Sequence, residues 1–173
     1  MANSQIFRYL VEGECEKKIT DCLKSECQSI VAGKVDVLNV TCKVISPAFI
    51  MALKKGTTVV LVFDTDRNNT CDVEMLERNI NSLTERGGIK NIVCIPQVNN
   101  LEDELVRSCN IKEPRQLTKS KSNKNFKADF LHMSNLKGRL ENCDFSISDF
   151  WSSVPQNEYK GLGNKASKIK IKK

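Results

Sequence analysis

The chain has 173 residues, 40% of them hydrophobic, and a net charge of +6 at pH 7. This length favours one domain with an appendage, because domains cluster near roughly 100–150 residues. No apolar stretch approaches the roughly 20 residues of a membrane span, and residues 1–9 lack the pattern of a signal peptide. We therefore expect a cytoplasmic protein that does not associate with membranes.

Segments of strand character alternate with segments of helical periodicity through the first two thirds of the chain. The expected strands are residues 6–11, 35–40, 57–63 and 92–95, and the expected helices are residues 16–27, 46–54, 72–85 and 101–109. The third strand is apolar and largely β-branched, which is typical of a parallel strand covered by helices on both faces. The alternation predicts an α/β fold, with a parallel-rich sheet of about four strands and helices on both faces.

The alternation weakens in the C-terminal third of the chain. Residues 125–140 predict one amphipathic helix, with Phe126, Phe130 and Met133 on its apolar face, and residues 147–151 predict another. Phe150 and Trp151 are expected to anchor this region to the core. The sequence thus divides into a core, a helical extension and a basic tail, which we place at residues 1–112, 113–159 and 160–173.

Positive charge is concentrated in two stretches, residues 112–127 and 160–173. The second stretch carries six lysines and no acidic residue, so all of the net charge resides there. We expect this tail to be mobile and to lie outside the core. Lysine-rich stretches either neutralise nucleic-acid phosphates or solubilise a terminus, and both interpretations stay open. The candidate nucleic-acid-binding residues are Lys119, Lys121, Lys124, Lys127, Lys165, Lys168 and Lys170.

Acidic residues follow three of the expected strands. Glu12 comes directly after the first strand and Glu16 lies one helical turn further, Asp64 and Asp66 follow the third strand, and Glu102 follows the fourth. Ligands of open α/β sheets bind at this edge, and clustered carboxylates repel one another unless a cation neutralises them. Oxygen ligands select Mg²⁺ (or Mn²⁺) over zinc. Each group alone could instead be a solvated turn, a helix cap or part of a surface ion pair.

The order of these motifs resembles the Toprim domain, which topoisomerases, bacterial primases, ribosomal-RNA maturases and OLD-family nucleases share. The segment Tyr9-Leu-Val-Glu12-Gly13 is followed by Val60-Leu-Val-Phe-Asp64-Thr-Asp66. The spacing Glu12-Gly-Glu-Cys-Glu16 and the acidic segment Asn100-Leu-Glu102-Asp-Glu104-Leu look more like the small standalone and OLD-type members. The resemblance covers roughly residues 5 to 110.

This resemblance implies a Toprim-like catalytic core and a metal-dependent nuclease that acts on DNA or RNA, in phage defence or RNA processing. Glu12, Asp64 and Asp66 would be catalytic and would bind Mg²⁺, with Glu16 and Glu102 as candidates for a second ion. The implied partners are nucleic acid and a protein of a larger assembly. The chain departs from other members because it lacks a Gly-x-x-x-x-Gly-Lys ATPase motif and a tyrosine placed as a topoisomerase nucleophile.

Other classes of function remain open at this point. The acidic residues could bind Mg²⁺ structurally in a non-catalytic binding or scaffold subunit. A haloacid-dehalogenase-type phosphatase also uses Asp-x-Asp at a strand end, but on its first strand, and a receiver domain would use Asp64 as phospho-acceptor. A zinc site is not expected, because eight cysteines form no Cys-x-x-Cys pair and His132 is the single histidine.

Overall fold

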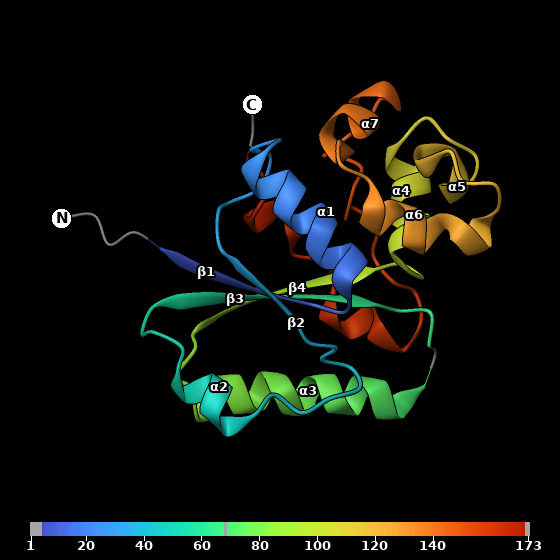
Figure 1. Ribbon diagram of the computed structural model, residues 1–173. Coiled ribbons are helices and arrows are strands. Elements are labelled where there is room, and N and C mark those ends of the chain that lie inside the picture. The colour runs from blue at the N-terminus through green and yellow to red at the C-terminus, as the bar shows by residue number, and fades with distance from the viewer. Residues whose placement is uncertain (1–4, 68, 172–173) are drawn as a thin grey trace.

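A computed structural model describes residues 5–67 and 69–171 of the chain. Four strands, β1 (Ile6–Val11), β2 (Lys34–Val37), β3 (Thr57–Asp64) and β4 (Asn91–Gln97), form one sheet in the order β2-β1-β3-β4. All three strand pairs are parallel. Helices surround this sheet (Figure 1), so the molecule has the expected Rossmann-like α/β fold.

The helices that connect the strands lie on opposite faces of the sheet. Helix α1 (Glu14–Ser25) covers one face, and α2 (Pro47–Met51) and α3 (Thr70–Glu85) cover the other (Figure 1). The chain therefore runs outward from β1 to β2 and then returns to β3 on the other side of β1. This reversal of strand order occurs between β1 and β3, and folds of this kind usually bind ligands in the crevice beyond the carboxyl ends of two such strands.

The side chains of β3 fill both layers of the core. Val60 and Val62 pack toward α1, whereas Val59, Leu61 and Phe63 pack toward α3, and all five are fully buried. Helices on both faces explain why this strand is apolar without alternation. This packing holds β3 rigidly and so fixes the position of its last residue, Asp64, at the edge of the sheet.

Polar side chains define the starts of the helices. Ser46 caps α2 by accepting a hydrogen bond from the Phe49 N–H at 3.2 Å, at the start of the helix expected over residues 46–54. The cap of α3 lies outside the helix expected over residues 72–85. The cap is Asn69, whose side chain accepts from the Asp72 N–H at 2.8 Å, so α3 begins two residues earlier than expected.

Most of the C-terminal third packs against the face that α1 covers (Figure 1), whereas Tyr159 packs on the α3 face. Its α-helices are α4 (Leu101–Ser108), α5 (Pro114–Thr118), α6 (Phe126–His132) and α7 (Leu136–Asn142), and its 3-10 helices are η1 (Asn123–Asn125), η2 (Glu158–Leu162) and η3 (Ala166–Lys168). Within the described ranges, no helix combines the length and apolar character needed to cross a membrane.

Two helix predictions in this region are wrong. The single helix expected over residues 125–140 is broken after His132, where Met133 adopts an extended backbone. Asn135 then starts α7 by accepting from the Gly138 N–H at 2.9 Å, which satisfies a donor that a new helix would otherwise leave unpaired. Residues 147–151 form turns rather than a helix, and Trp151 lies in the left-handed region with a φ of 53°. Trp151 is nevertheless buried and anchors the region, as expected.

The basic tail does not lie outside the core, which overturns the expectation for residues 160–173 over their described part. Ala166 and Ile169 are buried against the α1 side of the sheet. The Lys165 N–H donates to the Cys94 carbonyl of edge strand β4 at 3.0 Å, and the Val31 N–H donates to the Ile169 carbonyl at 2.9 Å. Lys165 and Lys168 are exposed beside these anchors, whereas Lys170 is half-buried, so the segment is both basic and packed.

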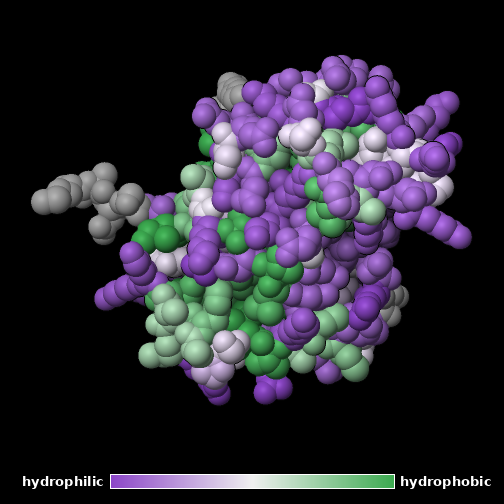
Figure 2. All heavy atoms as spheres, in the orientation of Figure 1, coloured by the Kyte–Doolittle hydropathy of each residue, from purple (hydrophilic) through white to green (hydrophobic). Residues whose placement is uncertain are grey.

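Hydrophobic side chains also reach the surface around α2. Figure 2 shows them gathered on the side of the molecule that carries this helix, whereas the helical extension is largely hydrophilic. Met51 is 75% exposed and Val44 is 44% exposed. Scattered exposed apolar residues are normal on soluble domains, so this feature assigns no function.

We predict that Ile169→Ala lowers the free energy of unfolding by about 2–5 kcal/mol, because it removes a fully buried side chain from the tail. The exposed neighbour Lys168 provides the control, and Lys168→Ala should change stability by less than about 0.5 kcal/mol. Urea denaturation measures both. Equal midpoints for the two variants would show that the tail does not stabilise the core.

Candidate functional site

The crevice between β1 and β3 holds Glu12 and Asp64 side by side. Glu12 follows β1 directly, and Asp64 is the last residue of the neighbouring strand β3. One carboxylate oxygen of Glu12, Oε2, accepts from the Asp64 N–H at 3.1 Å, and the other, Oε1, accepts from Asn39 Nδ2 at 2.8 Å. The Glu12 side chain is therefore fixed from two sides at the end of the sheet.

Asp64 carries a carboxylate that the fold does not neutralise. Its Oδ1 atom is buried and has no hydrogen-bond partner among the described residues. Burial raises the pKa of Asp64, and the nearby carboxylates of Glu12, Glu16, Asp66 and Glu102 raise it further, to about 9. A carboxylate with so high a pKa is strongly disfavoured in its charged form unless a cation approaches.

Glu16 reaches the same region from the first turn of α1 and is only 6% exposed. Burial raises the pKa of Glu16, and the charges of Glu12 and Glu102 act in the same direction. A Cβ atom at Gly13 would lie 2.8 Å from Glu16 Oε2, so a larger residue there would displace the Glu16 carboxylate from this position. This close approach gives a steric reason for the glycine that follows Glu12 in the sequence.

The remaining acidic residues approach from other segments. Asp66 is exposed in the loop after β3, and its charge contributes to the raised pKa of Asp64. Glu102 lies in the first turn of α4 and forms an ion pair with Lys127 of α6, with 3.3 Å between Oε1 and Nζ. The structure therefore brings together all five predicted acidic residues and one predicted lysine. We call Glu12, Glu16, Asp64, Asp66 and Glu102 the acidic cluster.

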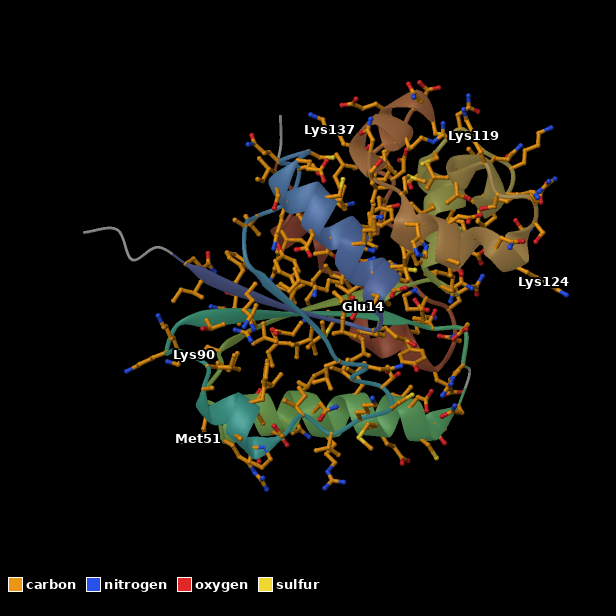
Figure 3. All side chains as sticks on the ribbon, in the orientation of Figure 1. Glu14, Met51, Lys90, Lys119, Lys124 and Lys137 are labelled. Atoms are coloured by element: carbon orange, nitrogen blue, oxygen red, sulfur yellow. The ribbon has the colours of Figure 1, made fainter. Side chains whose placement is uncertain are left out.

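The other candidate lysines lie elsewhere. Lys119 and Lys121 line a shallow pocket with His132 and Arg139, on the helical extension. Figure 3 shows Lys119 and Lys124 pointing outward from that extension. The structure thus does not bring these lysines to the acidic cluster.

Among the described residues, no lysine of the tail forms an ion pair with the acidic cluster, unlike Lys127. Lys165 and Lys168 are exposed on the C-terminal segment. Lys170 lines a different pocket, where its Nζ donates to the Ser148 carbonyl at 3.2 Å. Of the seven candidate lysines, the structure places Lys127 at the cluster.

The donor chemistry of the acidic cluster suits a hard divalent cation. All of its donors are carboxylate oxygens, which Mg²⁺ and Mn²⁺ prefer, and the buried Oδ1 of Asp64 is unpaired within the described residues. No three acidic, histidine or cysteine side chains of the described ranges yet stand in a metal-ligating arrangement. Asn39 and the Asp64 backbone each donate to one oxygen of Glu12. Each carboxylate oxygen has two lone pairs, so Glu12 can ligate a metal while these hydrogen bonds orient it.

Sequence reasoning missed Asn39. It lies in the loop after β2, where an asparagine is ordinarily a turn former. Its Oδ1 accepts from the Thr41 N–H at 3.1 Å, while its Nδ2 donates to Glu12. No local pattern distinguishes this role, because the partner is 27 residues away.

Comparison of the chain with protein-family models, curated proteins and solved structures gives no match. The assignment of chemistry to the acidic cluster therefore rests on its geometry and on the sequence motifs.

We predict that Asp64→Asn raises the free energy of unfolding by roughly 1 kcal/mol or more, measured in EDTA at about pH 8. For a chain of this size, each kcal/mol raises Tm by about 2–4 °C. The folded-state pKa is raised from 3.8 to about 9, so the wild type loses stability as the pH rises between these values. The difference between variant and wild type should therefore shrink toward pH 4. Thermal denaturation at several pH values measures this.

The control is Glu77→Gln, which removes one charge from an exposed position on α3. This variant should show no pH-dependent gain over the wild type. Excess Mg²⁺ should stabilise the wild type more than Asp64→Asn. If the stability of Asp64→Asn and of the wild type depended on pH in the same way, a raised pKa of Asp64 would be contradicted.

Proposed function

We propose that this protein is a Mg²⁺-dependent nuclease that cleaves phosphodiester bonds of DNA or RNA in the cytoplasm. The observation that carries the proposal is the convergence of the acidic cluster, with its unpaired buried Asp64 Oδ1, at the crevice between β1 and β3. The Toprim-like order of the Glu-Gly and Asp-x-Asp motifs supports the same chemistry. The small standalone and OLD-type members suggest phage defence or RNA processing as the setting, with a partner protein in a larger assembly.

The residues of the cluster divide into two groups by position. Glu12, Asp64 and Asp66 lie at the ends of β1 and β3 and would form the primary Mg²⁺ (or Mn²⁺) site. Glu16 and Glu102 begin α1 and α4 and would serve a second ion. When bound, the metal supplies positive charge at the phosphodiester oxygens and lowers the pKa of an attacking water. Glu12, which adjoins Asp64, is the side chain best placed to accept a proton from that water.

Lys127 supplies a positively charged side chain beside the acidic cluster, whose own members are all acidic. It reaches Glu102 from α6, which packs against α1, so the helical extension completes the site. Phosphoryl transfer requires positive charge on the nonbridging oxygens. We propose that Lys127 exchanges its ion pair with Glu102 for a substrate phosphate.

Nucleic acid would extend from the crevice over the helical extension. Lys119 and Lys121 border one shallow pocket there, beside His132. These side chains would contact the phosphate backbone without reading sequence. His132 has its Nδ1 2.7 Å from the Ala128 carbonyl and is exposed, which suits a surface role rather than a catalytic base.

The decisive experiment is incubation of the purified chain with panels of single-stranded and double-stranded DNA and RNA, in Mg²⁺, Mn²⁺ or EDTA. We expect cleavage that EDTA abolishes. A phosphomonoester substrate run in parallel tests the phosphatase alternative. Metal-dependent binding without cleavage of any substrate would favour the scaffold alternative instead.

We predict that Asp64→Asn and Glu12→Gln each reduce cleavage by roughly 100-fold or more, because each removes a metal ligand worth several kcal/mol in the transition state. Glu77→Gln, which is equal in charge change, should retain full activity. Gel-based cleavage assays on folded variants measure the difference. Full activity of the Asp64→Asn variant would show that the acidic cluster takes no part in cleavage.

We predict that Lys127→Met lowers the cleavage rate by roughly 100-fold at saturating substrate, because it removes one charged donor from the transition state. The matched control is Lys124→Met, since Lys124 is exposed and points outward (Figure 3). Lys124→Met should weaken substrate binding at most, and should leave the rate at saturation unchanged. Equal rates for both variants would show that Lys127 does not act at the scissile phosphate.

A further inference from the structure

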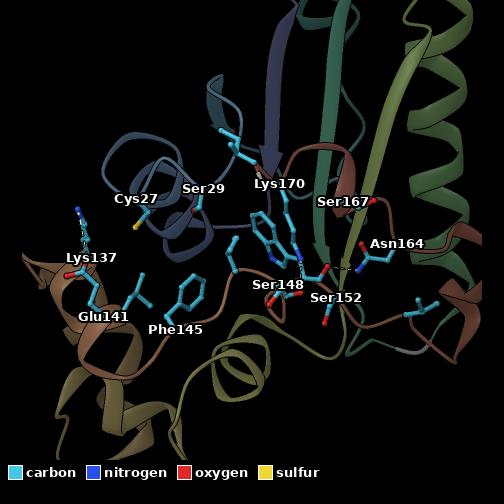
Figure 4. Close-up of a pocket in the computed structure, with 15 residues that line it drawn as sticks. Cys27, Ser29, Lys137, Glu141, Phe145, Ser148, Ser152, Asn164, Ser167 and Lys170 are labelled. Carbon is cyan, nitrogen blue, oxygen red and sulfur yellow. Dashed lines mark hydrogen bonds and ion pairs between the residues drawn. The ribbon is translucent and has the colours of Figure 1, made fainter. Parts of the chain in front are cut away.

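A second site of the molecule lies at the opposite end of α1 from Glu16. A pocket of about 900 Å³ opens there between the segment after α1, helix α7 and the packed C-terminal tail (Figure 4). Cys27 and Ser29 line it from the α1 side, and Lys170 lines it from the tail. Its volume falls within the range of roughly 300–1,000 Å³ that small-molecule sites occupy. We call it the tail pocket.

The walls of the tail pocket are mainly apolar. Leu140, Phe145 and Ile147 form one side, and Val154 and Ile171 face the same space. Val154 is 46% exposed and Ile171 is 42% exposed, so two aliphatic side chains remain in contact with solvent inside one concave surface. Covering such a wall with an apolar body removes apolar surface from water and is therefore favourable.

Lys170 places a positive charge beside these apolar walls. Its Nζ donates to the Ser148 carbonyl at 3.2 Å (Figure 4), and the described residues offer it no carboxylate within ion-pair distance. The other lysine of the pocket, Lys137, is already paired with Glu141 at 3.8 Å. Burial lowers the pKa of Lys170, while Glu104 and Asp149 act only from a distance to raise it. A half-buried ammonium group without a counter-ion is stabilised by an anion.

Trp151 adds an independent sign of a ligand. It lines the tail pocket, is 1% exposed, and carries a buried indole N–H without an acceptor among the described residues. Native proteins seldom leave such a donor unpaired. Its backbone lies in the left-handed region with a φ of 53°, and its backbone N–H donates to Glu104 Oε2 at 3.0 Å. The surrounding structure thus maintains a strained residue in this wall.

We infer that the tail pocket binds a small amphipathic anion, whose apolar body covers the wall formed by Phe145, Val154 and Ile171 and whose single carboxylate or phosphate group pairs with Lys170. Direct charge-assisted hydrogen bonds of this kind are about twice as strong as neutral ones. The acidic cluster takes no part, because it lies at the other end of α1. The inference is therefore independent of the proposed nuclease activity.

Isothermal titration calorimetry of the full chain with decanoate, decyl phosphate and decanol tests this inference. We expect saturable binding of at least one anion, about 10-fold or more tighter than binding of decanol, because the alcohol lacks the charge. The tighter of the two anions identifies the head group that the pocket selects. Absence of saturable binding for both anions would overturn the inference.

Four variants locate the binding site. Lys170→Met keeps the alkyl stem and should weaken anion binding about 10-fold, to the level of decanol, whereas Lys170→Arg should restore it. Val154→Asp places a like charge in the apolar wall at an exposed position and should abolish anion binding. Lys168→Met, on the same segment but outside the pocket, should bind as the wild type does.

Thermal denaturation of each variant accompanies the titrations. Unchanged anion binding in both Lys170→Met and Val154→Asp would show that the anion binds elsewhere and would overturn the inference. Asp64→Asn should bind the anion as the wild type does. Failure of the nuclease proposal and failure of this inference are therefore separable.

Discussion

Burial of the Asp64 carboxyl group beside Glu12 is the physical basis of the acidic cluster, and the charges of the other acidic residues add to its cost. Glu12 and Asp64 end two neighbouring parallel strands, and the strands themselves are held by fully buried side chains such as Val62. The carboxylates therefore cannot separate without disturbing the central layer of the core. Asn39 and the Asp64 backbone N–H satisfy Glu12, but Asp64 Oδ1 remains without a partner among the described residues. The fold thus stores an electrostatic cost that a cation would relieve.

Helix α1 ties this crevice to the rest of the molecule. Its first turn places Glu16 in the acidic cluster, and the close approach of Gly13 permits that placement. Its apolar side packs against the helical extension, so α6 can bring Lys127 toward Glu102. The helix of 12 residues spans about 18 Å, and the tail pocket opens beyond its other end. One rigid element therefore positions both sites while keeping them apart.

The C-terminal tail packs on both faces of the sheet and along the edge strand β4. Tyr159 packs on the α3 face, whereas Ile169 packs on the α1 face, and Lys165 pairs with edge strand β4 between them. An exposed strand edge offers unpaired backbone groups to other chains, and this crossing covers part of that edge. The same crossing carries Lys170 to the tail pocket. A segment that looks like a solubilising extension therefore packs against the core and lines the tail pocket.

The sequence by itself determined the alternation of strands and helices up to about residue 110, because apolar periodicity and helix-start residues such as Ser46 act over a few neighbouring positions. It also placed Glu12, Asp64 and Asp66 at one sheet edge, since the carboxyl ends of parallel strands meet there. Which lysine joins the acidic cluster follows from packing between distant segments, because Lys127 lies on α6, which packs against α1, whereas Lys124 lies on η1 and is exposed. The position of the tail also follows from such packing. There a few apolar anchors such as Ile169 outweigh the surrounding lysines, most of which keep their side chains exposed.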